Sequence, residues 1–226
     1  MSQALKLTSG LQQAGLDIAA DIQQKLLDYL ALMQKWNKVH NLTAVRDPDE
    51  MVTLHLLDSL VVLPHIQTTG FKVSNLLDVG SGAGLPGIPL ALCMPELQVT
   101  VMDSSQKKAS FMRQAKAELG IKNLEVVSGR VEQFKPPAKF DIVISRAFSD
   151  LALFIKLTRH LCAADGMWLA MKGVYPDAEL AELETKMQLT PSKIIALEVP
   201  ALEAQRHLVF FPNSNNEIQS LCEANQ

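Results

Sequence analysis

The 226-residue chain carries a formal net charge of −3, and 48% of its residues are hydrophobic. This length suits one sizeable α/β core with an extension and is too short for two full catalytic domains. The composition is that of an ordinary globular protein, without the long apolar run of a membrane-spanning helix or a signal peptide. The widely separated Cys93, Cys162 and Cys222 predict neither disulfides nor zinc, so we expect a cytoplasmic protein without a metal.

Basic residues are unevenly placed, although the net charge does not indicate a nucleic-acid-binding protein. One group lies within residues 35–46 and a second within residues 107–130. Such residues usually form solvated helix faces, but they also hold phosphate backbones. Charge alone therefore leaves both interpretations open.

The first 70 residues are predicted to form a helical extension. Apolar residues recur at helical spacing over residues 21–40, which predicts an amphipathic helix. A second helix should begin at Asp47, whose side chain can cap it, and Pro48 suits its first turn. We expect this helix to run to about Leu63 and to stop at Pro64.

From residue 71 the pattern changes to short apolar runs that alternate with helical stretches. The runs expected to form parallel strands are residues 76–79, 99–102, 124–127, 142–145 and 168–171. After a helix near 177–187, the runs 194–199 and 207–211 leave no room for a crossover helix, so they should pair antiparallel. Residues 71–226 therefore predict an α/β, Rossmann-like fold, with a mostly parallel seven-stranded sheet that ends in an antiparallel C-terminal hairpin.

A glycine-rich loop follows the first predicted strand and precedes a helix. Gly80, Gly82 and Gly84 allow a tight turn and the close approach of a ligand, beside the positive end of that helix. Gly82-x-Gly84-x-x-Gly87 also satisfies the dinucleotide pattern, with Asp103 at the spacing of a ribose-binding carboxylate. The pattern alone therefore leaves an NAD-dependent dehydrogenase open.

The register of the glycines favours S-adenosylmethionine as the cofactor. The glycines begin where the strand ends, at Gly80, whereas the dinucleotide match starts later and contains Pro86. Asp78 would repel a pyrophosphate but suits the sulfonium and ammonium groups of S-adenosylmethionine. Asp103 closes the second strand, where it can accept both ribose hydroxyls and can also cap the helix from Ser104 onward. We therefore expect a class I S-adenosylmethionine-dependent methyltransferase, with S-adenosylhomocysteine as product.

One motif is more specific than a general methyltransferase glycine loop. Residues 77–90, LDVGSGAGLPGIPL, resemble the signature of the glucose-inhibited division protein B family. The resemblance covers essentially the whole chain, through the motifs KWNKVHNLT (35–43), HLLDS (55–59), ISRAF (144–148), MKG (171–173) and RHL (206–208). It implies the family's activity, methylation of guanine N7 in bacterial small-subunit ribosomal RNA, at nucleotide 527 in the 530 loop of 16S ribosomal RNA.

The resemblance also implies roles for individual residues. Gly80 and Leu85 would line the cofactor, the pair Val131 and Glu132 would border its adenine, and Arg146 would face the transfer site. The residues expected to bind the cofactor are Asp78, Gly80, Gly82, Gly84, Leu85, Asp103, Ser104, Val131, Glu132 and Arg146.

Four basic residues match positions around the family's cleft. We expect Arg146 and Lys172 to act in catalysis. Arg130, Lys172 and Arg206 are expected to hold RNA phosphate or the target base, although each suits an exposed or ion-paired cation as well.

A further polar group lies on the second predicted helix. His55, Asp58 and Ser59 share one face at positions i, i+3 and i+4. We expect them to form an internal polar cluster that docks the N-terminal helices onto the sheet, in preference to a catalytic group.

The chemistry implied is simple. Methyl transfer from a sulfonium is an in-line displacement that needs neither a metal nor a covalent nucleophile, and guanine N7 carries no proton, so no general base is required. Residues 145–148 do not resemble the Asn/Asp-Pro-Pro-Tyr/Phe loop of exocyclic-amine methyltransferases, and no cysteine lies in the Pro-Cys loop of carbon-5 cytosine methylation. The target base must be single-stranded or flipped, and Phe148 either stacks on it or belongs to the core.

The expected partner is 16S ribosomal RNA or the small ribosomal subunit, bound by a monomeric protein. Two other functions remain open. An S-adenosylmethionine enzyme for a small molecule would act without RNA, and a cofactor-binding partner of the ribosome would transfer no methyl group to any RNA.

Overall fold

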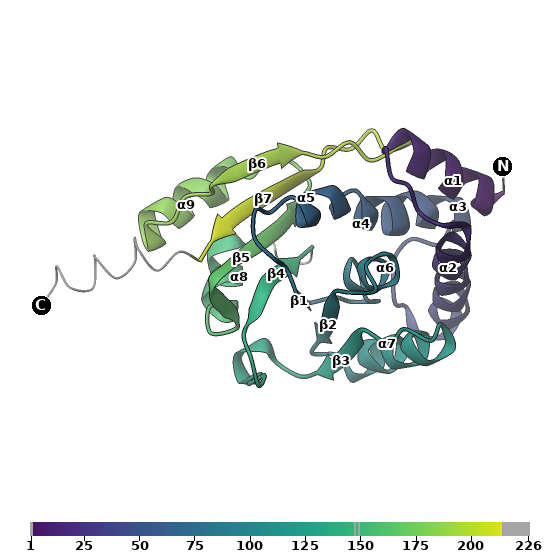
Figure 1. Cartoon of the computed structure of the whole chain (residues 1–226), viewed down its shortest axis with the longest axis horizontal. Coiled ribbons are helices and arrows are strands. Elements are labelled where there is room, and N and C mark those ends of the chain that lie inside the picture. Colours follow the sequence, from purple (N-terminus) through teal and green to yellow (C-terminus); the bar gives the residue numbers. More distant parts are fainter. Residues whose placement is uncertain (1, 147, 149, 214–226) are drawn as a thin grey trace, which may run out of the picture.

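The computed structural model describes residues 2–146, 148 and 150–213, and its centre is a seven-stranded sheet (Figure 1). The strand order is β3-β2-β1-β4-β5-β7-β6. The strands are β1 Asn75–Val79, β2 Gln98–Asp103, β3 Leu124–Ser128, β4 Phe140–Ser145, β5 Cys162–Lys172, β6 Lys193–Ala196 and β7 His207–Pro212. Strands β1 to β5 pair in parallel, and β7 pairs antiparallel with β5 and β6, which confirms the predicted fold class.

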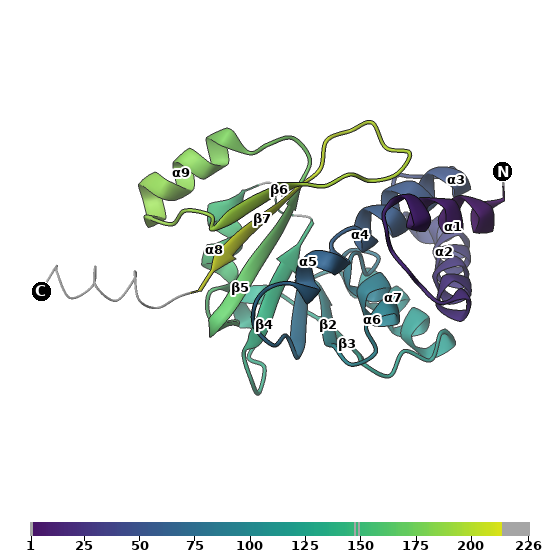
Figure 2. The same cartoon turned by 45° about the horizontal axis from the view of Figure 1, so that its top comes forward.

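Helices cover both faces of the sheet (Figures 1 and 2). On one face lie α6 (Gly87–Cys93) and α7 (Gln106–Glu118), and on the other lie α8 (Leu151–Thr158) and α9 (Asp177–Met187). Successive strand residues point to opposite faces, so Leu76 and Leu77 of β1 belong to two different apolar cores. Burial on both faces explains why the strands are continuous apolar runs. No helix among the described residues is long and apolar enough to span a membrane.

The N-terminal helices form an outer layer on the face covered by α6 and α7. They include α1 (Gln3–Gln13), which the sequence pattern did not delimit, and α2 (Ala20–His40). Helix α2 packs against α6 and α7. Its buried Tyr29 and Met33 belong to the same apolar core as Ile88 of α6 and Phe111 of α7. The N-terminal segment therefore shares a core with the sheet.

The second predicted helix is interrupted in the structure. Its parts are α3 (Pro48–Met51), the π-helical η1 (Val52–Leu57) and α4 (Asp58–Leu60), followed by α5 (Leu63–Gln67). Asp47 caps α3 as predicted, because its side chain accepts hydrogen bonds from the main-chain N–H groups of Asp49 and Glu50. The prediction that the helix stops at Pro64 was wrong. Pro64 lies in the first turn of α5, where a main-chain N–H is not needed.

Two strands differ in length from the prediction. β5 begins at Cys162, earlier than the predicted run 168–171. β6 ends at Ala196, before the end of the predicted run 194–199. Leu197 and Val199 leave the sheet and are buried in the core beside α4 and α5. The main-chain N–H of Leu197 donates to the carbonyl oxygen of Arg206 as the chain turns toward β7. The prediction that Leu197 and Val199 belong to the strand was therefore wrong.

Candidate cofactor and acceptor site

The loop after β1 turns at three glycines with left-handed backbone. The φ angles of Gly80, Gly82 and Gly84 are 69°, 62° and 94°. A Cβ at Gly82 would meet no atom within 4 Å, so the space beside this residue is open to a ligand. A Cβ at Gly84 would lie 2.3 Å from Cδ1 of Ile88, so glycine is required there for the loop to pack on α6.

Asp78 stabilises this loop through buried hydrogen bonds. Its fully buried carboxylate accepts a hydrogen bond from the hydroxyl of Ser81 and another, at 2.8 Å, from the main-chain N–H of Gly87. Burial raises the pKa of Asp78 to about 6. Asp78 lines neither of the two cavities beside the loop, so its contact with the cofactor stays a prediction.

Asp103 ties the end of β2 to the same loop. Oδ2 accepts from the main-chain N–H of Gly82 at 3.0 Å, and Oδ1 accepts from that of Ser105 at 2.8 Å. The ammonium of Lys108 lies 3.5 Å from Oδ2. Helix α7 is capped by Ser105, which leaves Asp103 to join the loop and the helix. Because each carboxylate oxygen can accept more than one hydrogen bond, Asp103 can still receive the hydroxyls of a ribose.

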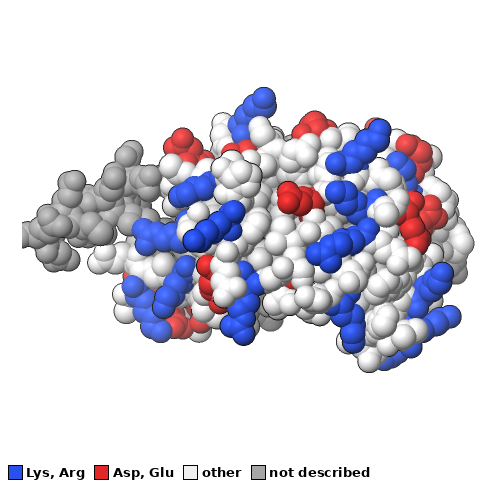
Figure 3. Space-filling model, turned by 90° about the horizontal axis from the view of Figure 1, so that it is seen from below, with Lys and Arg blue, Asp and Glu red and all other residues white. Residues whose placement is uncertain are grey.

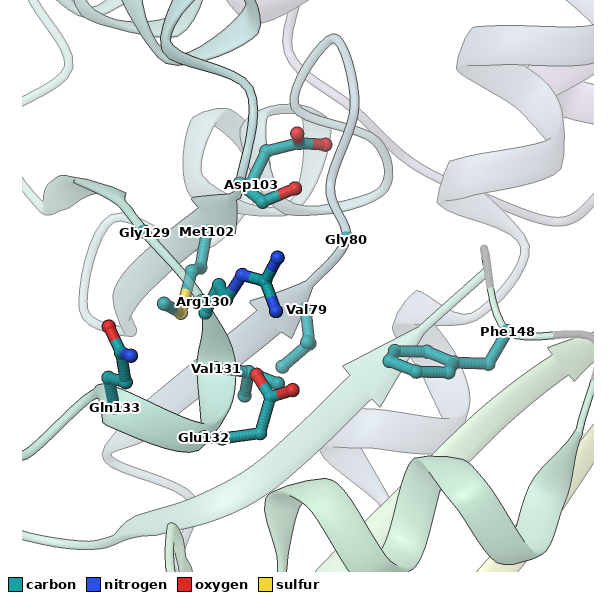
Figure 4. A pocket seen from close by; sticks show the side chains of 11 residues that line it. Val79, Gly80, Met102, Asp103, Gly129, Arg130, Val131, Glu132, Gln133 and Phe148 are labelled. Carbon is teal, nitrogen blue, oxygen red and sulfur yellow. The ribbon is translucent and has the colours of Figure 1, made fainter.

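A cavity of about 690 Å³ opens at the carboxyl ends of β1 and β2, and we call it the strand-end cavity (Figure 4). Its lining residues are Val79, Gly80, Met102, Asp103, Ser104, Gly129, Arg130, Val131, Glu132, Gln133 and Phe148. Val131 and Glu132 belong to the short helix η2 (Val131–Gln133), and Phe148 lies across the cavity from them. Apolar side chains among polar ones, with a carboxylate at the strand end, suit a nucleoside.

A smaller cavity of about 290 Å³, the loop cavity, lies along the glycine loop. Its lining residues are Leu42, Thr43, His55, Gly80, Ser81, Gly82, Ala83, Leu85, Lys108 and Arg146. It shares Gly80 with the strand-end cavity. Because Leu42 and Thr43 follow α2, the N-terminal segment supplies one wall of this cavity.

A third cavity of about 430 Å³, the arginine cavity, adjoins the second. Its lining residues are Val45, Leu54, His55, Asp58, Arg146, Met171, Lys172, Gly173 and Arg206. It shares His55 and Arg146 with the loop cavity. The three cavities therefore form a row, joined by common lining residues.

Two arginines of the arginine cavity share one buried carboxylate. Nη1 of Arg146 donates to Oδ2 of Asp58 at 2.7 Å and to the carbonyl oxygen of Leu54 at 3.0 Å. Nε of Arg206 donates to Oδ1 of Asp58 at 2.7 Å. Asp58, a member of the predicted polar cluster, thus links the N-terminal helices to residues beside β4 and β7. It also lines the arginine cavity.

The other two predicted basic residues, Lys172 and Arg130, differ in whether they form an ion pair. The ammonium of Lys172 lies 2.7 Å from Glu179 of α9 and donates to the carbonyl oxygen of Phe148 at 3.2 Å. Arg130 is exposed and makes no ion pair with the described residues. The structure places Lys172 in the arginine cavity with the two arginines, and Arg130 apart from them in the strand-end cavity.

His55 lies where the loop cavity and the arginine cavity meet. Its Nε2 lies 3.0 Å from the hydroxyl oxygen of Thr43. Burial lowers the pKa of His55 to about 4, so the ring is neutral at physiological pH. Ser59, the third member of the predicted polar cluster, is buried and lines neither cavity.

Several site residues carried little signal in the sequence. The buried hydroxyl of Tyr29 in α2 donates a hydrogen bond to the carbonyl oxygen of Ala83 in the glycine loop. Leu42 and Thr43 were marked only by their place in the matched motif at 35–43, and Lys108 only by its basic neighbours. Which of these residues meets the loop depends on how the outer helices pack.

Neither a metal cluster nor a reactive thiol is found in the described part of the chain. No three His, Cys, Asp or Glu side chains there come together as a metal site. Burial raises the pKa of the free thiols of Cys93 and Cys162 to about 12. Cys222 lies outside the described residues.

The sheet order, the glycine loop after β1 and the carboxylate that ends β2 define an S-adenosylmethionine-dependent methyltransferase. A solved structure described as a SAM-dependent methyltransferase from Aquifex aeolicus has the same fold, with a TM-score of 0.55 and 18% identity. The similarity covers 78% of this chain and 96% of that chain.

The chain belongs to the GidB family, described as rRNA small subunit methyltransferase G, whose sequence profile matches residues 22–209. It is 67% identical over 207 residues to the Ribosomal RNA small subunit methyltransferase G of Methylobacillus flagellatus, covering 92% of this chain and 97% of that one. The protein of the same name from Nitrosospira multiformis is 52% identical over 216 residues, with the same two coverages of 92% and 97%. The family inferred from the sequence motifs is thereby confirmed.

Proposed function

We propose that the protein transfers a methyl group from S-adenosylmethionine to N7 of one guanine in small-subunit ribosomal RNA. The row of three cavities carries this proposal, because it joins a nucleoside site, the glycine loop and a separate arginine-lined cavity into one site. The names of the relatives supply the RNA, and the family resemblance supplies the guanine.

The residues present fit the methyl donor. Asp103 would accept the ribose hydroxyls, Val131 would border the base, and the open space beside Gly82 would take the amino-acid part. Asp78 and Gly84 would act indirectly, by stabilising the conformation of the glycine loop. When bound, S-adenosylmethionine supplies a methyl group on a sulfonium, which needs no further activation. The expected cofactor residues that line the strand-end or loop cavity are Gly80, Gly82, Leu85, Asp103, Ser104, Val131, Glu132 and Arg146.

The arginine cavity suits an acceptor that loses no proton. Guanine N7 offers a lone pair, so the transfer requires no general base. Arg146 and Arg206 can donate hydrogen bonds to the O6 atom of guanine, which orients the base without occupying N7. Catalysis would then rest on positioning, which contributes on the order of 7 to 11 kcal/mol in well-oriented reactions.

The basic residues expected to bind RNA differ in whether they already form ion pairs within the protein. Arg130 has no counter-ion among the described residues and can offer its charge to a phosphate. Lys172 and Arg206 already hold carboxylates, so we expect them to orient the acceptor more than the RNA backbone. Figure 3 shows Lys and Arg side chains over much of one face of the molecule, with Asp and Glu among them. A larger RNA could lie on this face.

Phe148 would contribute a ring to this site. The half-buried ring packs 5.2 Å from that of Phe154 and lines the strand-end cavity, not the arginine cavity. Its stacking on the target base stays a prediction, supported by its partial exposure. The same position would let it pack against the cofactor.

We further propose that residues 1–70 act as a helical extension of a methyltransferase domain formed by residues 71–226. The wall that Leu42, Thr43 and His55 give to the loop cavity supports this role. A protein that acts on ribosomal RNA would work in the cytoplasm, and we expect it to act there as a monomer.

Label transfer from S-adenosylmethionine tests the proposal. The purified protein should label 16S ribosomal RNA, or small subunits, taken from cells that lack it. Label that enters only small molecules would contradict the proposal in favour of a small-molecule methyltransferase. Cofactor binding without transfer to either RNA substrate would leave a binding protein of the ribosome.

A further inference from the structure

Asp58 joins three distant parts of the chain at the arginine cavity. It begins α4 in the N-terminal segment, whereas Arg146 follows β4 and Arg206 precedes β7. Each arginine donates to a different oxygen of the Asp58 carboxylate, at 2.7 Å in both cases. In the part of the chain that the structure describes, neither arginine pairs with any other carboxylate.

The carboxylate lies deeper than the two arginines that it holds. The side chain of Asp58 is 3% exposed, whereas those of Arg146 and Arg206 are 27% and 23% exposed. Breaking a buried pair of this kind leaves an uncompensated charge, so the geometry is held firmly. A guanidinium has five N–H donors, and among the described residues each arginine retains donors beyond those bonded to Asp58, Leu54 and Gln205.

We propose that Asp58 is a positioning residue for methyl transfer, which fixes Arg146 and Arg206 in the orientation that receives the acceptor base. This inference rests on the proposed function. Although Asp58 lines the cavity, its carboxylate is 3% exposed and both oxygens are bonded to the arginines, so it would act on the base through them. Its loss would therefore affect the transfer step more than cofactor binding.

The charge of Asp58 supports the same role. A base methylated at N7 becomes cationic, and two uncompensated arginines beside it would oppose that change. Asp58 neutralises one of the two charges, and His55 at the same cavity adds none, because burial keeps its pKa at about 4. The cavity can therefore donate hydrogen bonds to the base at a limited electrostatic cost.

The first test is Asp58→Asn, which keeps the size of the side chain and removes its charge. We expect the single-turnover rate of transfer to small-subunit RNA to fall roughly a hundredfold, the loss typical of a misplaced group. The dissociation constant of S-adenosylhomocysteine, measured by calorimetry, should rise by a much smaller factor, because Arg146 also lines the loop cavity.

Asp141→Asn is the matched control. Asp141 is a partly buried carboxylate at the far end of the strands, where it accepts main-chain hydrogen bonds from Ser74 at 2.7 Å and Asn75 at 3.2 Å. Its substitution should lower the thermal unfolding temperature and leave the transfer rate unchanged. A general loss of stability is thereby separated from a loss of positioning.

If Asp58→Asn does not fold, Asp58→Glu tests the positioning role of Asp58. It keeps the charge but displaces the carboxylate by one methylene, so we expect a transfer rate about tenfold below wild type. A wild-type rate in the variants that fold would overturn the inference. So would an equal loss of cofactor affinity, which indicates damage to the whole site. Failure of the wild-type protein to methylate any RNA would instead overturn the proposed function.

Discussion

Two buried ionisable residues near the glycine loop respond to burial in opposite directions. Burial raises the pKa of Asp78 from 3.8 to about 6 and lowers that of His55 from 6.5 to about 4. The folded protein therefore binds a proton more tightly at Asp78, and less tightly at His55, than the unfolded chain does. As the pH rises from about 4 to 6, stability from Asp78 is lost and stability from His55 is gained. The two contributions oppose each other over one pH window.

Substitution of either residue should reveal the contribution of the other. The free energy of unfolding of Asp78→Asn should rise between pH 4 and 6, because the titration of His55 is then unopposed. That of His55→Gln should fall over the same interval, because the titration of Asp78 remains. Urea unfolding at several pH values measures both, and curves parallel to that of wild type would refute the account.

Gly82 and Gly84 differ in what surrounds them, although both have left-handed backbone. Alanine at either position costs about 1–2 kcal/mol of backbone strain. Gly84→Ala should lose roughly 1–3 kcal/mol more, because its methyl group would meet Ile88. Gly82→Ala should instead fold and bind S-adenosylhomocysteine more weakly. Urea unfolding and calorimetry measure these effects, and equal stability of the two variants would contradict this difference.

At the scale of elements, α2 supports the glycine loop from outside the sheet. The hydroxyl of Tyr29 is its direct link to the loop, through the carbonyl oxygen of Ala83. Burial raises the pKa of Tyr29 well above its ordinary value, so the hydroxyl remains a donor. The N-terminal helices thus have a physical route to the cofactor site, beyond covering apolar surface.

Tyr29→Phe tests this link. It leaves the carbonyl of Ala83 without its side-chain donor, which should lower the free energy of unfolding by about 1–3 kcal/mol and weaken S-adenosylhomocysteine binding. The control is Tyr175→Phe, because Tyr175 is exposed and its hydroxyl has no hydrogen bond to a described residue. Equal behaviour of the two variants in calorimetry and chemical unfolding would show that the hydrogen bond does not support the loop.

At the scale of the whole molecule, local patterns predicted the sheet because strands buried on both faces are continuous apolar runs. The same patterns misplaced the end at Pro64 and extended β6 through Val199, because tertiary packing decided both. The glycine loop was predictable, since close turns demand glycine. The Asp58 cluster was not, because its arginines lie 88 and 148 positions away in the sequence and only the fold brings them together.

The central claim is that this site methylates guanine N7 in ribosomal RNA. Borohydride–aniline treatment cleaves RNA at N7-methylated guanine, so it should cut small-subunit RNA of wild-type cells at one guanine and leave that guanine intact in cells lacking the protein. Treatment of the intact RNA with the purified protein and S-adenosylmethionine should restore the cut. Identical cleavage of the two cellular RNAs would contradict the claim.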